Sequence, residues 1–479
     1  MSHNKLGLSI LCTALLSSML AGCQKTPEVS PTSSPVKLTV WTYYNGDQLA
    51  AFNSLVDEFN RTVGQEQNIS IESYSQGSVS DLETNLMDAA EQKVGAADLP
   101  DLFSGYVDTA YSLDKMGLLV DLDGYLTDEE RDVYIDGYLN EGRFSGDGSL
   151  KLFPIAKSTE LLLLNETDWE PFAAATGAAY ADLETIEGLI STAELYYNWT
   201  DAQTPEPDDG RAFFGRDAMA NYLLVGAKQL GTTIFDVKDG KMTLDFDKNT
   251  VRTLWDSYYV PFIKGYFAAS GRFRSDDIKT GNLISYQGSS SSASFFPTQV
   301  STSGSETHDI RLKVLPAPKF KDGADVAVQQ GAGMAVIKGS DEQTNAAVTF
   351  LKWITQPEHN IRFSVDSGYI PVTKYASDIN HIEESGFTVS DSIRDILTVS
   401  LETVTSNDLY TTSSFAGYKD ARQVLECALS DQASGDRAIV EDRIAQGMSA
   451  EDAEAEFLSD DAFECWYAAT LKNLQEFQD

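Results

Sequence analysis

Cysteine and histidine are both scarce, with four of each among 479 residues. Of the histidines, His308, His359 and His381 stand far apart, and none has the spacing of a metal-ligand pair. No HExxH or GxSxG motif occurs, and the glycines of Gly331-Ala332-Gly333 lack the third glycine of a dinucleotide loop. We therefore predict no metal site, no cofactor and no enzymatic activity.

One acidic stretch has the beginning of a calcium-binding loop. Asp245, Asp247 and Asn249 occupy its first, third and fifth positions, but Thr250 stands where glycine is needed and Asp256 where glutamate is needed. The same residues suit the end of a strand followed by a helix that Asp247 or Asn249 caps. We favour the capped helix.

Positive charge is also in short supply. The chain has 35 Lys and Arg against 73 Asp and Glu, a net charge of −38. Such a balance disfavours nucleic acid or an anionic membrane surface as the main partner. Carboxylates are so frequent that their number gives no evidence for or against the carboxylate pair of a glycosidase.

Long apolar runs are missing except near the start. Lys5 precedes the almost uncharged stretch 6–19, which is short for a membrane span and typical of a secretory signal. Leu20-Ala21-Gly22-Cys23 resembles the lipobox of bacterial lipoproteins. The resemblance implies that residues 1–22 are a signal peptide and that Cys23 carries lipid such as palmitate. The alternative is a plain signal peptide with an incidental cysteine.

The residues that follow Cys23 predict a tether. Prolines at 27, 31 and 35 alternate with Ser and Thr, and such a segment stays extended because it has little apolar surface to bury. We assign residues 23–35 to a lipidated, disordered linker. Of the remaining cysteines, Cys427 and Cys465 can form a disulfide or stay two buried thiols, and the sequence leaves both open.

Strand and helix patterns alternate along the body of the chain. Strands are predicted at 36–41, 69–74, 98–103, 150–154 and 160–164. Helices are predicted after Asp47 and at 81–92 and 107–115, and the part beyond Ser390 is mainly helical. This order predicts an α/β fold of mostly parallel sheets flanked by helices, with a ligand crevice at the carboxyl ends of the strands.

Aromatic residues make up 10% of the chain, and several follow predicted strands. Tyr43 and Tyr44 come after the first strand and Tyr106 after another, while Tyr369 lies in the turn-like Gly368-Tyr369-Ile370-Pro371. Aromatic faces beside hydroxyl groups suit a sugar-like ligand. Core packing is the alternative for each of these rings.

Four segments in a common order carry a family resemblance. They are VKLTVWTYYNGDQLAAFNSLVDEFN, LPDLFSGYVDTAYSLDKMGLLVDLDGYL, GSLKLFPIAKSTELLLLN and AAVTFLKWITQPEHNIRFSVDSGYIPVT. Together they resemble the family 1 extracellular solute-binding proteins of ABC importers, in the branch that includes the glycerol-3-phosphate-binding protein.

The resemblance implies two α/β lobes with the ligand held at the hinge between them. We expect the chain to cross between lobes near 156–160, 287–291 and 331–334. The first lobe would then comprise 36–156 plus 289–331, and the second 159–286 plus 334–479.

The resemblance also implies ligand-binding residues. They are Ser158, Ser289 or Ser290, Gly331, Tyr369 and Arg422, beside the aromatic Tyr43, Tyr44 and Tyr106. Two positions depart from that branch, where Ser78 or Val79 replaces a tyrosine and Val107 a glutamate. The ligand is therefore expected to be a mono- or oligosaccharide, with glycerol-3-phosphate or a glycerophosphodiester as the alternative.

The expected function is that of a monomeric, membrane-tethered solute receptor. It would hold its small-molecule ligand outside the cytoplasm, anchored by lipid to the cell membrane, and deliver it to the membrane subunits of an ABC permease. From other classes, a secreted glycosidase and a surface adhesion lipoprotein are the alternatives.

Overall fold

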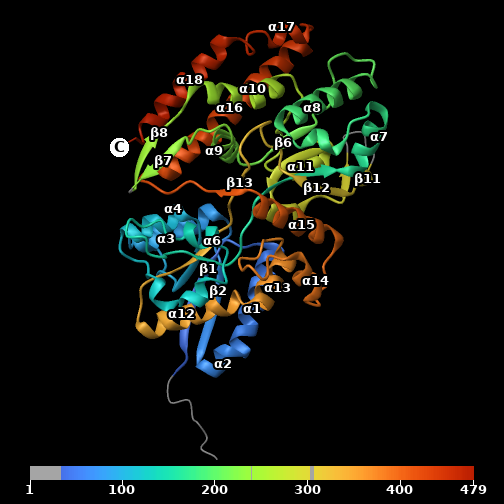
Figure 1. The fold of residues 1–479 in the computed structure, drawn as a ribbon. Helices are drawn as coiled ribbons and strands as arrows, with labels where there is room; N and C mark the ends of the chain where they lie inside the picture. The colour runs from blue at the N-terminus through green and yellow to red at the C-terminus, as the bar shows by residue number, and fades with distance from the viewer. Residues whose placement is uncertain (1–33, 239, 302–306, 479) are drawn as a thin grey trace, which may run out of the picture. The chain divides into compact units, whose positions relative to one another are not determined.

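The computed structural model describes residues 34–238, 240–301 and 307–478. The predicted signal peptide, Cys23 and nearly all of the predicted tether lie outside the described residues. From Val36 onward the described chain belongs to one unit with two lobes (Figure 1). Among the described residues, no helix is both long and apolar enough to cross a membrane.

The first lobe is built on a sheet in the order β2-β1-β3-β14-β4. Strand β1 pairs in parallel with β2 and β3, whereas β14 runs antiparallel to both β3 and β4. The strands are β1 (Val36–Thr42), β2 (Ile69–Ser75), β3 (Leu102–Gly105), β4 (Phe153–Pro154) and β14 (Gly333–Val336).

Helices bury an apolar stripe against this first sheet. Helix α1 shows the reason, because Phe52, Leu55, Val56 and Phe59 recur at helical spacing and all are buried. The helices of this lobe are α1 (Gly46–Arg61), α2 (Val63–Gln67), α3 (Val79–Ala90), α4 (Val107–Lys115), α5 (Asp128–Arg131), α6 (Asp136–Glu141), α12 (Asp341–Ile354) and α13 (Pro357–Ser367), with the 3-10 turn η1 (Asp123–Tyr125).

The second lobe has a sheet in the order β12-β5-β9-β6. Strand β5 is antiparallel to both of its neighbours, and only β6 and β9 pair in parallel. The central sequence of β5 is apolar throughout because Leu162 and Leu164 face one core while Leu161 and Leu163 face another. The strands are β5 (Glu160–Asn165), β6 (Phe214–Arg216), β9 (Ser285–Ser289) and β12 (Leu312–Pro316).

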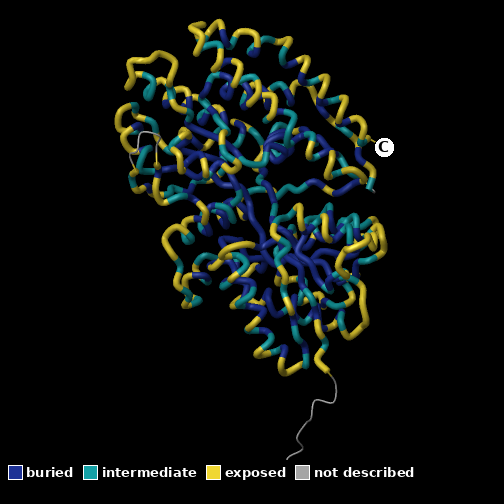
Figure 2. The backbone as a smooth tube through the Cα atoms, turned by 180° about the vertical axis from the view of Figure 1, so that it is seen from behind, coloured by how far each residue is buried: buried dark blue, intermediate teal, exposed yellow. Residues whose placement is uncertain are grey.

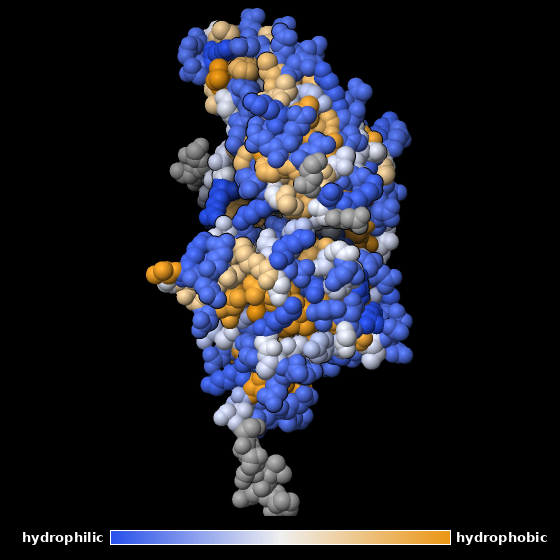
Figure 3. Space-filling view, turned by 90° about the vertical axis from the view of Figure 1, so that its left-hand side faces the viewer, coloured by the Kyte–Doolittle hydropathy of each residue, from blue (hydrophilic) through white to orange (hydrophobic). Residues whose placement is uncertain are grey.

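Helices cover the faces of this second sheet, and their outer surfaces are exposed (Figure 2). They are α7 (Glu166–Thr176), α8 (Ile186–Asp201), α9 (Met219–Gln229), α10 (Lys248–Ile263), α11 (Arg274–Thr280), α15 (Asp391–Ser406), α16 (Tyr418–Ala445), α17 (Ala450–Glu454) and α18 (Asp460–Gln475). The surface seen in Figure 3 is mostly hydrophilic, as the acidic composition leads one to expect.

Shorter elements complete the described chain. They are the strand pairs β7 (Phe235–Lys238) with β8 (Lys241–Leu244), β10 (Gln299–Ser301) with β11 (Thr307–Asp309), and β13 (Val326–Val328) with β15 (Asp408–Tyr410), the helix α14 (Ile379–Glu384), and the 3-10 turns η2 (Tyr180–Leu183) and η3 (Ser290–Phe295).

The α/β fold class is confirmed, with local differences. The helix at 107–115 has the predicted bounds. Helix α1 begins at Gly46, so Asp47 lies inside it, and the preceding Asn45 makes no side-chain capping bond. Strand β3 begins at Leu102 rather than at Asp98, and Pro100, which lacks an amide hydrogen, lies in the part that is not strand. The second sheet is mainly antiparallel, because β5 is flanked by antiparallel strands on both edges.

The division into lobes differs from the one predicted. Residues 312–316 pair with β5 of the second lobe, not with the first. Residues 333–336 pair with β3 of the first lobe, and α12 and α13 bury side chains in the same core. The expected crossing at 287–291 is therefore replaced by a continuation within the second lobe, where Ala293 of η3 packs with Leu161.

Two crossings lie side by side where they were expected. Ser158 and Gln330 exchange backbone hydrogen bonds of 2.9 and 3.0 Å, so the strands that link the lobes are paired. Gly331 has φ +93°, and a Cβ there would lie 2.8 Å from Lys157 Cα. Glycine is needed at this point because a side chain would collide with the neighbouring crossing.

Two further expectations concern polar residues of the second lobe. Asp247 caps α10 by accepting a 2.8 Å hydrogen bond from the Thr250 amide, which confirms the capped helix. Cys427 and Cys465 are free thiols, so the disulfide alternative is wrong. The Cys427 thiol accepts a bond from Gln423 of its own helix, and Cys465 is exposed on α18.

Candidate ligand-binding cleft

A cavity of about 270 Å³ lies between the two lobes beside the paired crossings. Both lobes line it, as a site that closes around a ligand requires. Its polar and aromatic lining residues are Glu83, Tyr106, Asp108 and Glu141 from the first lobe, Gln329 and Gln330 from the crossing, and Asn221, Tyr410, Thr411, Thr412, Tyr418 and Arg422 from the second lobe.

The four predicted tyrosines form one cluster in the first lobe. Tyr43 stacks on Tyr106 with ring centroids 6.1 Å apart, and its hydroxyl lies 3.2 Å from that of Tyr369. Tyr44 packs 5.1 Å from Tyr43 and 6.0 Å from Tyr369. Burial raises the pKa of all four phenols, so the rings are neutral at physiological pH.

Within this cluster, Tyr106 lines the cavity. Tyr43, Tyr44 and Tyr369 belong to the buried core of the first lobe and support Tyr106 from behind. Tyr106 therefore has the position expected of a ligand-contacting ring, whereas Tyr43, Tyr44 and Tyr369 pack in the core and fix its position. Tyr369 comes from a distant part of the sequence and reaches the cluster through the turn after α13.

Arg422 projects from the first turns of α16 into the cavity. Its Nη2 donates a 2.6 Å hydrogen bond to Asn221 Oδ1 on α9. Burial alone would lower the pKa of Arg422, but Tyr418 and Glu426 more than offset this effect, and its pKa lies above the ordinary value. A permanently charged group therefore faces the cleft from the second lobe.

Ser158 and Gly331 lie at the paired crossings and Ser289 and Ser290 at the end of β9, rather than on the cavity wall. Ser158 pairs through its backbone with Gln330. Ser290 is fully buried and its hydroxyl accepts from the Thr159 amide at 3.3 Å, while Ser289 Oγ lies 3.0 Å from Ser291 Oγ. Ser158 and Gly331 thus pair the two crossings, Ser290 bonds to Thr159 of the first crossing, and Ser289 contacts Ser291 within the second lobe.

Carboxylates surround the cleft, and most have a basic partner. Glu141 forms a buried ion pair with Lys157, whose Nζ also donates to Gly331 O at 3.0 Å. Glu83 pairs with Lys419 at 2.5 Å. Asp108 is different, because burial, and next Glu83, raise its pKa above the ordinary value. The cleft is thus polar without a strong excess of positive charge.

Sequence reasoning missed Asn221, Gln330 and Glu141 at this site. Asn221 is the one with a usable signal, since it is a polar residue within the otherwise apolar start of the helix MANYLLVGA and is 5% exposed. A buried amide needs partners, which Glu160 and Arg422 supply. Glu141 carries no such signal, because its partner Lys157 is near only after folding.

Metal binding receives no support from the geometry. In the part of the chain that the structure describes, no group of three or more His, Cys, Asp or Glu side chains is arranged to hold a metal ion.

Solved structures of similar fold are binding proteins. The cyclic alpha-maltosyl-1,6-maltose binding protein from Arthrobacter globiformis is 19% identical, with a TM-score of 0.65 over 92% of this chain and 100% of that one. UgpB from Mycobacterium tuberculosis in complex with glycerophosphocholine is 19% identical, with a TM-score of 0.66 over 93% and 98%. The GacH receptor of Streptomyces glaucescens is 14% identical, with a TM-score of 0.66 over 93% and 100%. At these identities the likeness shows the fold.

The family follows from the sequence match. Residues 54–386 match the family model described as bacterial extracellular solute-binding protein. That span covers more than half of the chain and includes both crossings beside the cleft and most of the first-lobe sheet. Members of such a family act outside the cytoplasm as binding proteins. The chain belongs to the bacterial extracellular solute-binding proteins.

Proposed function

We propose that this protein captures a mono- or oligosaccharide in the cleft between its lobes and delivers it to an ABC permease. The observation that carries the proposal is the supported Tyr106 ring, which faces amide and guanidinium groups across the cavity. A flat ring packs on the C–H face of a sugar while polar groups meet its hydroxyls. The protein would bind its solute without transforming it.

Each lobe would supply one kind of contact. Tyr106, held by Tyr43, Tyr44 and Tyr369, would stack on the sugar from the first lobe. Arg422 and Asn221 would form hydrogen bonds to hydroxyls from the second lobe. Ser158 and Gly331, at the paired crossings, would act by allowing closure, and Ser290 would support them through its bond to Thr159. Of the proteins with similar structures, one binds cyclic alpha-maltosyl-1,6-maltose and another was solved in complex with acarbose, which supports a sugar as the ligand.

A glycerophosphodiester is the second candidate ligand, and Arg422 is the observation in its favour. A guanidinium can bind a phosphate oxygen through its forked donors, and the similar UgpB structure holds glycerophosphocholine. The neighbouring Glu83, Asp108 and Glu141 would oppose an anion, however, because like charges raise the cost of bringing a phosphate into the cleft. We therefore place the sugar first.

A thermal-shift screen of residues 35–479 against sugars, polyols and glycerophosphate esters tests the proposal. A ligand that binds only the native state raises the melting temperature by mass action. We expect a shift with a neutral sugar that Tyr106→Ala reduces and that Tyr74→Ala, an exposed tyrosine on β2, leaves intact. A shift with phosphate esters alone would overturn the sugar assignment, and no shift with any compound would overturn the receptor.

Location at the membrane is a further part of the proposal. We infer that Cys23 is lipidated and that the segment 23–35 holds the two lobes near the permease. Tethering would raise the local concentration of the loaded receptor at its transporter. It is supported by the Leu20-Ala21-Gly22-Cys23 motif and by the proline-rich segment after it.

A further inference from the structure

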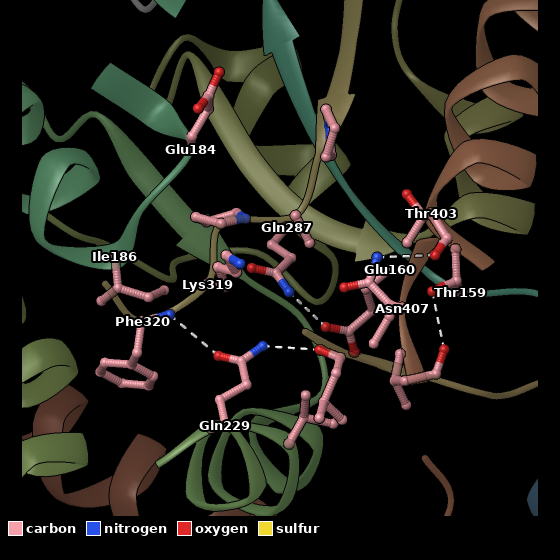
Figure 4. Close-up of a pocket in the computed structure, with 18 of the residues that line it drawn as sticks. Thr159, Glu160, Glu184, Ile186, Gln229, Gln287, Lys319, Phe320, Thr403 and Asn407 are labelled. Atoms are coloured by element: carbon pink, nitrogen blue, oxygen red, sulfur yellow. Dashed lines mark hydrogen bonds between the residues drawn. The ribbon is translucent and has the colours of Figure 1, made fainter. Parts of the chain in front are cut away.

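A second and larger cavity, of about 530 Å³, lies within the second lobe (Figure 4). Strands β5, β6 and β9 form its floor, α9 and the end of α15 form two walls, and the segment 315–328 forms a third. It is separate from the cleft, since the groups on its walls come from the second lobe and from the segment that leads to the crossing. The two cavities share Asn221, Val225 and Val328.

The floor of this cavity is a buried polar cluster. Glu160 Oε2 accepts from Arg216 Nη2 at 2.9 Å and from Gln287 Nε2 at 2.7 Å, and its Oε1 accepts from Asn221 Nδ2 at 2.6 Å. Glu160, Arg216 and Gln287 are 4%, 7% and 5% exposed. In Figure 4 the Gln287 side chain reaches toward Glu160 at the centre of the view.

This cluster leaves hydrogen-bonding capacity unused. Arg216 Nε and Gln287 Oε1 are buried and have no hydrogen-bond partner among the residues that the structure describes. An unpartnered buried donor and acceptor are each costly, and a buried ion pair contributes little net stability. A cluster of this kind at the bottom of an open cavity is better explained by a polar ligand than by the stability of the lobe.

The walls resemble those of a small-molecule site. Apolar groups from Leu315, Pro316, Ala317 and Val326 lie above the polar floor, and Phe320 closes one end. Arg216 is fixed by its position 4.8 Å over the Tyr222 ring. An apolar wall with a few convergent polar groups, in a cavity of several hundred Å³, is the usual form of a ligand pocket.

Charge selects the class of ligand. Arg216 and Lys319 face the cavity along with Glu160, Glu184, Asp325 and Glu402, so acids exceed bases. Arg216 is already paired with Glu160, and Lys319 with Asp325. An anion would therefore meet Glu184 and Glu402, which have no basic partner among the residues that the structure describes. The carboxylate, guanidinium and amide groups of the floor instead suit hydroxyls.

We propose that this cavity is a second binding site, which takes a neutral polyhydroxylated compound of mono- or disaccharide size. The site is independent of the solute that the cleft takes. It is adjacent to the cleft through Asn221, whose amide donates to Glu160 on one side and accepts from Arg422 on the other. Asn221 therefore lines both cavities.

Calorimetric titration of residues 35–479 with glycerol, myo-inositol, glucose, trehalose and maltose tests the proposal. The cleft is first disabled by Tyr106→Ala, because this ring lines the cleft and not the second cavity. We expect at least one of these compounds still to bind, with a Kd below about 1 mM. Ala317→Trp, which fills the cavity from a half-buried wall position, then weakens that binding by about tenfold or more, and so does Gln287→Leu.

Controls separate this proposal from the function of the cleft. Ala174→Trp, at an exposed position on α7, must leave the binding unchanged. If no compound binds once the cleft is disabled, or if Ala317→Trp has no effect, the second site is refuted. The proposal for the cleft then stands or falls on binding by the unmodified chain. Binding of glycerol-3-phosphate in preference to the neutral compounds would also refute it. If the variant with the disabled cleft still binds a compound and adding Ala317→Trp abolishes that binding, the second site is supported. This result does not depend on the proposal for the cleft.

Discussion

At the scale of single residues, Asp217 is a half-buried carboxyl with a raised pKa. It follows β6, is 29% exposed, and accepts a 3.3 Å hydrogen bond from the Arg274 amide. Burial raises its pKa to about 6, although Arg274 acts in the opposite direction. The folded state therefore binds a proton more tightly than the unfolded chain does between about pH 4 and 6.

The consequence is a pH-dependent loss of stability. The contribution of Asp217 to the free energy of unfolding is most favourable below about pH 4, falls as the pH rises to about 6, and is level above that value. Asp217→Asn removes the charge. As the pH rises through this range, the variant should therefore become more stable than the natural chain, by on the order of 2 kcal/mol. Urea unfolding of both proteins at several pH values measures the difference.

An exposed aspartate provides the control for Asp217. Asp132→Asn on the first lobe should give a difference from the natural chain that stays constant over the same pH range. A constant difference for Asp217→Asn as well would show that burial of this carboxyl does not set its titration.

At the scale of elements, a contact between helices spans the two lobes. Glu83 on α3 of the first lobe pairs with Lys419 on α16 of the second, and Thr109 Oγ1 donates to Glu83 at 3.1 Å. The Lys419 side chain is 63% exposed and that of Glu83 is 13% exposed, so the pair is weak and sensitive to salt. It favours the arrangement in which the lobes meet.

Breaking this pair should weaken ligand binding. Glu83→Gln removes one charge, and we expect the Kd for the solute with the largest thermal shift to rise by up to about fivefold at low salt. The effect should shrink at 1 M salt, roughly the concentration at which screening reaches a few ångströms. Titration at the two salt concentrations measures both values. As a control, Asp88→Asn breaks a pair with Lys93 inside the first lobe and should leave the Kd unchanged at both salt concentrations.

Local elements could be predicted from the sequence because their signals are local. The stripe of Phe52, Leu55, Val56 and Phe59 specifies a buried helix face, and Asp247 specifies a cap, wherever the rest of the chain lies. Strand partners are different. The segment 312–316 pairs with β5 because that strand has an open edge in the folded lobe. No residue within 312–316 specifies which strand edge it will pair with.

At the scale of the whole molecule, the two-lobed fold could be predicted, but which late segments belong to which lobe could not. The order of the four segments that resemble the family points to the fold. Lobe membership instead depends on the return of the chain at Gly331, where a single glycine permits two crossings to touch. The cleft was predicted in part: Tyr106 and Arg422 line it, but Asn221 and Glu141 enter it only through tertiary contacts.

The acidic surface of the protein affects how it could be held at a membrane. A net charge of −38 gives the body of the protein no electrostatic attraction to an anionic membrane. In the proposed arrangement, retention at the membrane would depend on the lipid proposed for Cys23. Several acyl chains, at about 0.8 kcal/mol for each buried methylene, would outweigh the repulsion of the acidic surface.

Substitution of the two N-terminal cysteines separates anchoring from export. Cys23→Ser should move the protein from the membrane fraction to the soluble extracytoplasmic fraction, while its thermal shift with the cleft ligand stays unchanged, because the lobes begin at Val36. Cys12→Ser lies within the predicted signal and should leave the protein in the membrane fraction. Fractionation and mass spectrometry of the N-terminus measure both. A Cys23→Ser protein that stays in the membrane fraction would mean that the acidic body is retained by a partner, for which the permease would be the first protein to test.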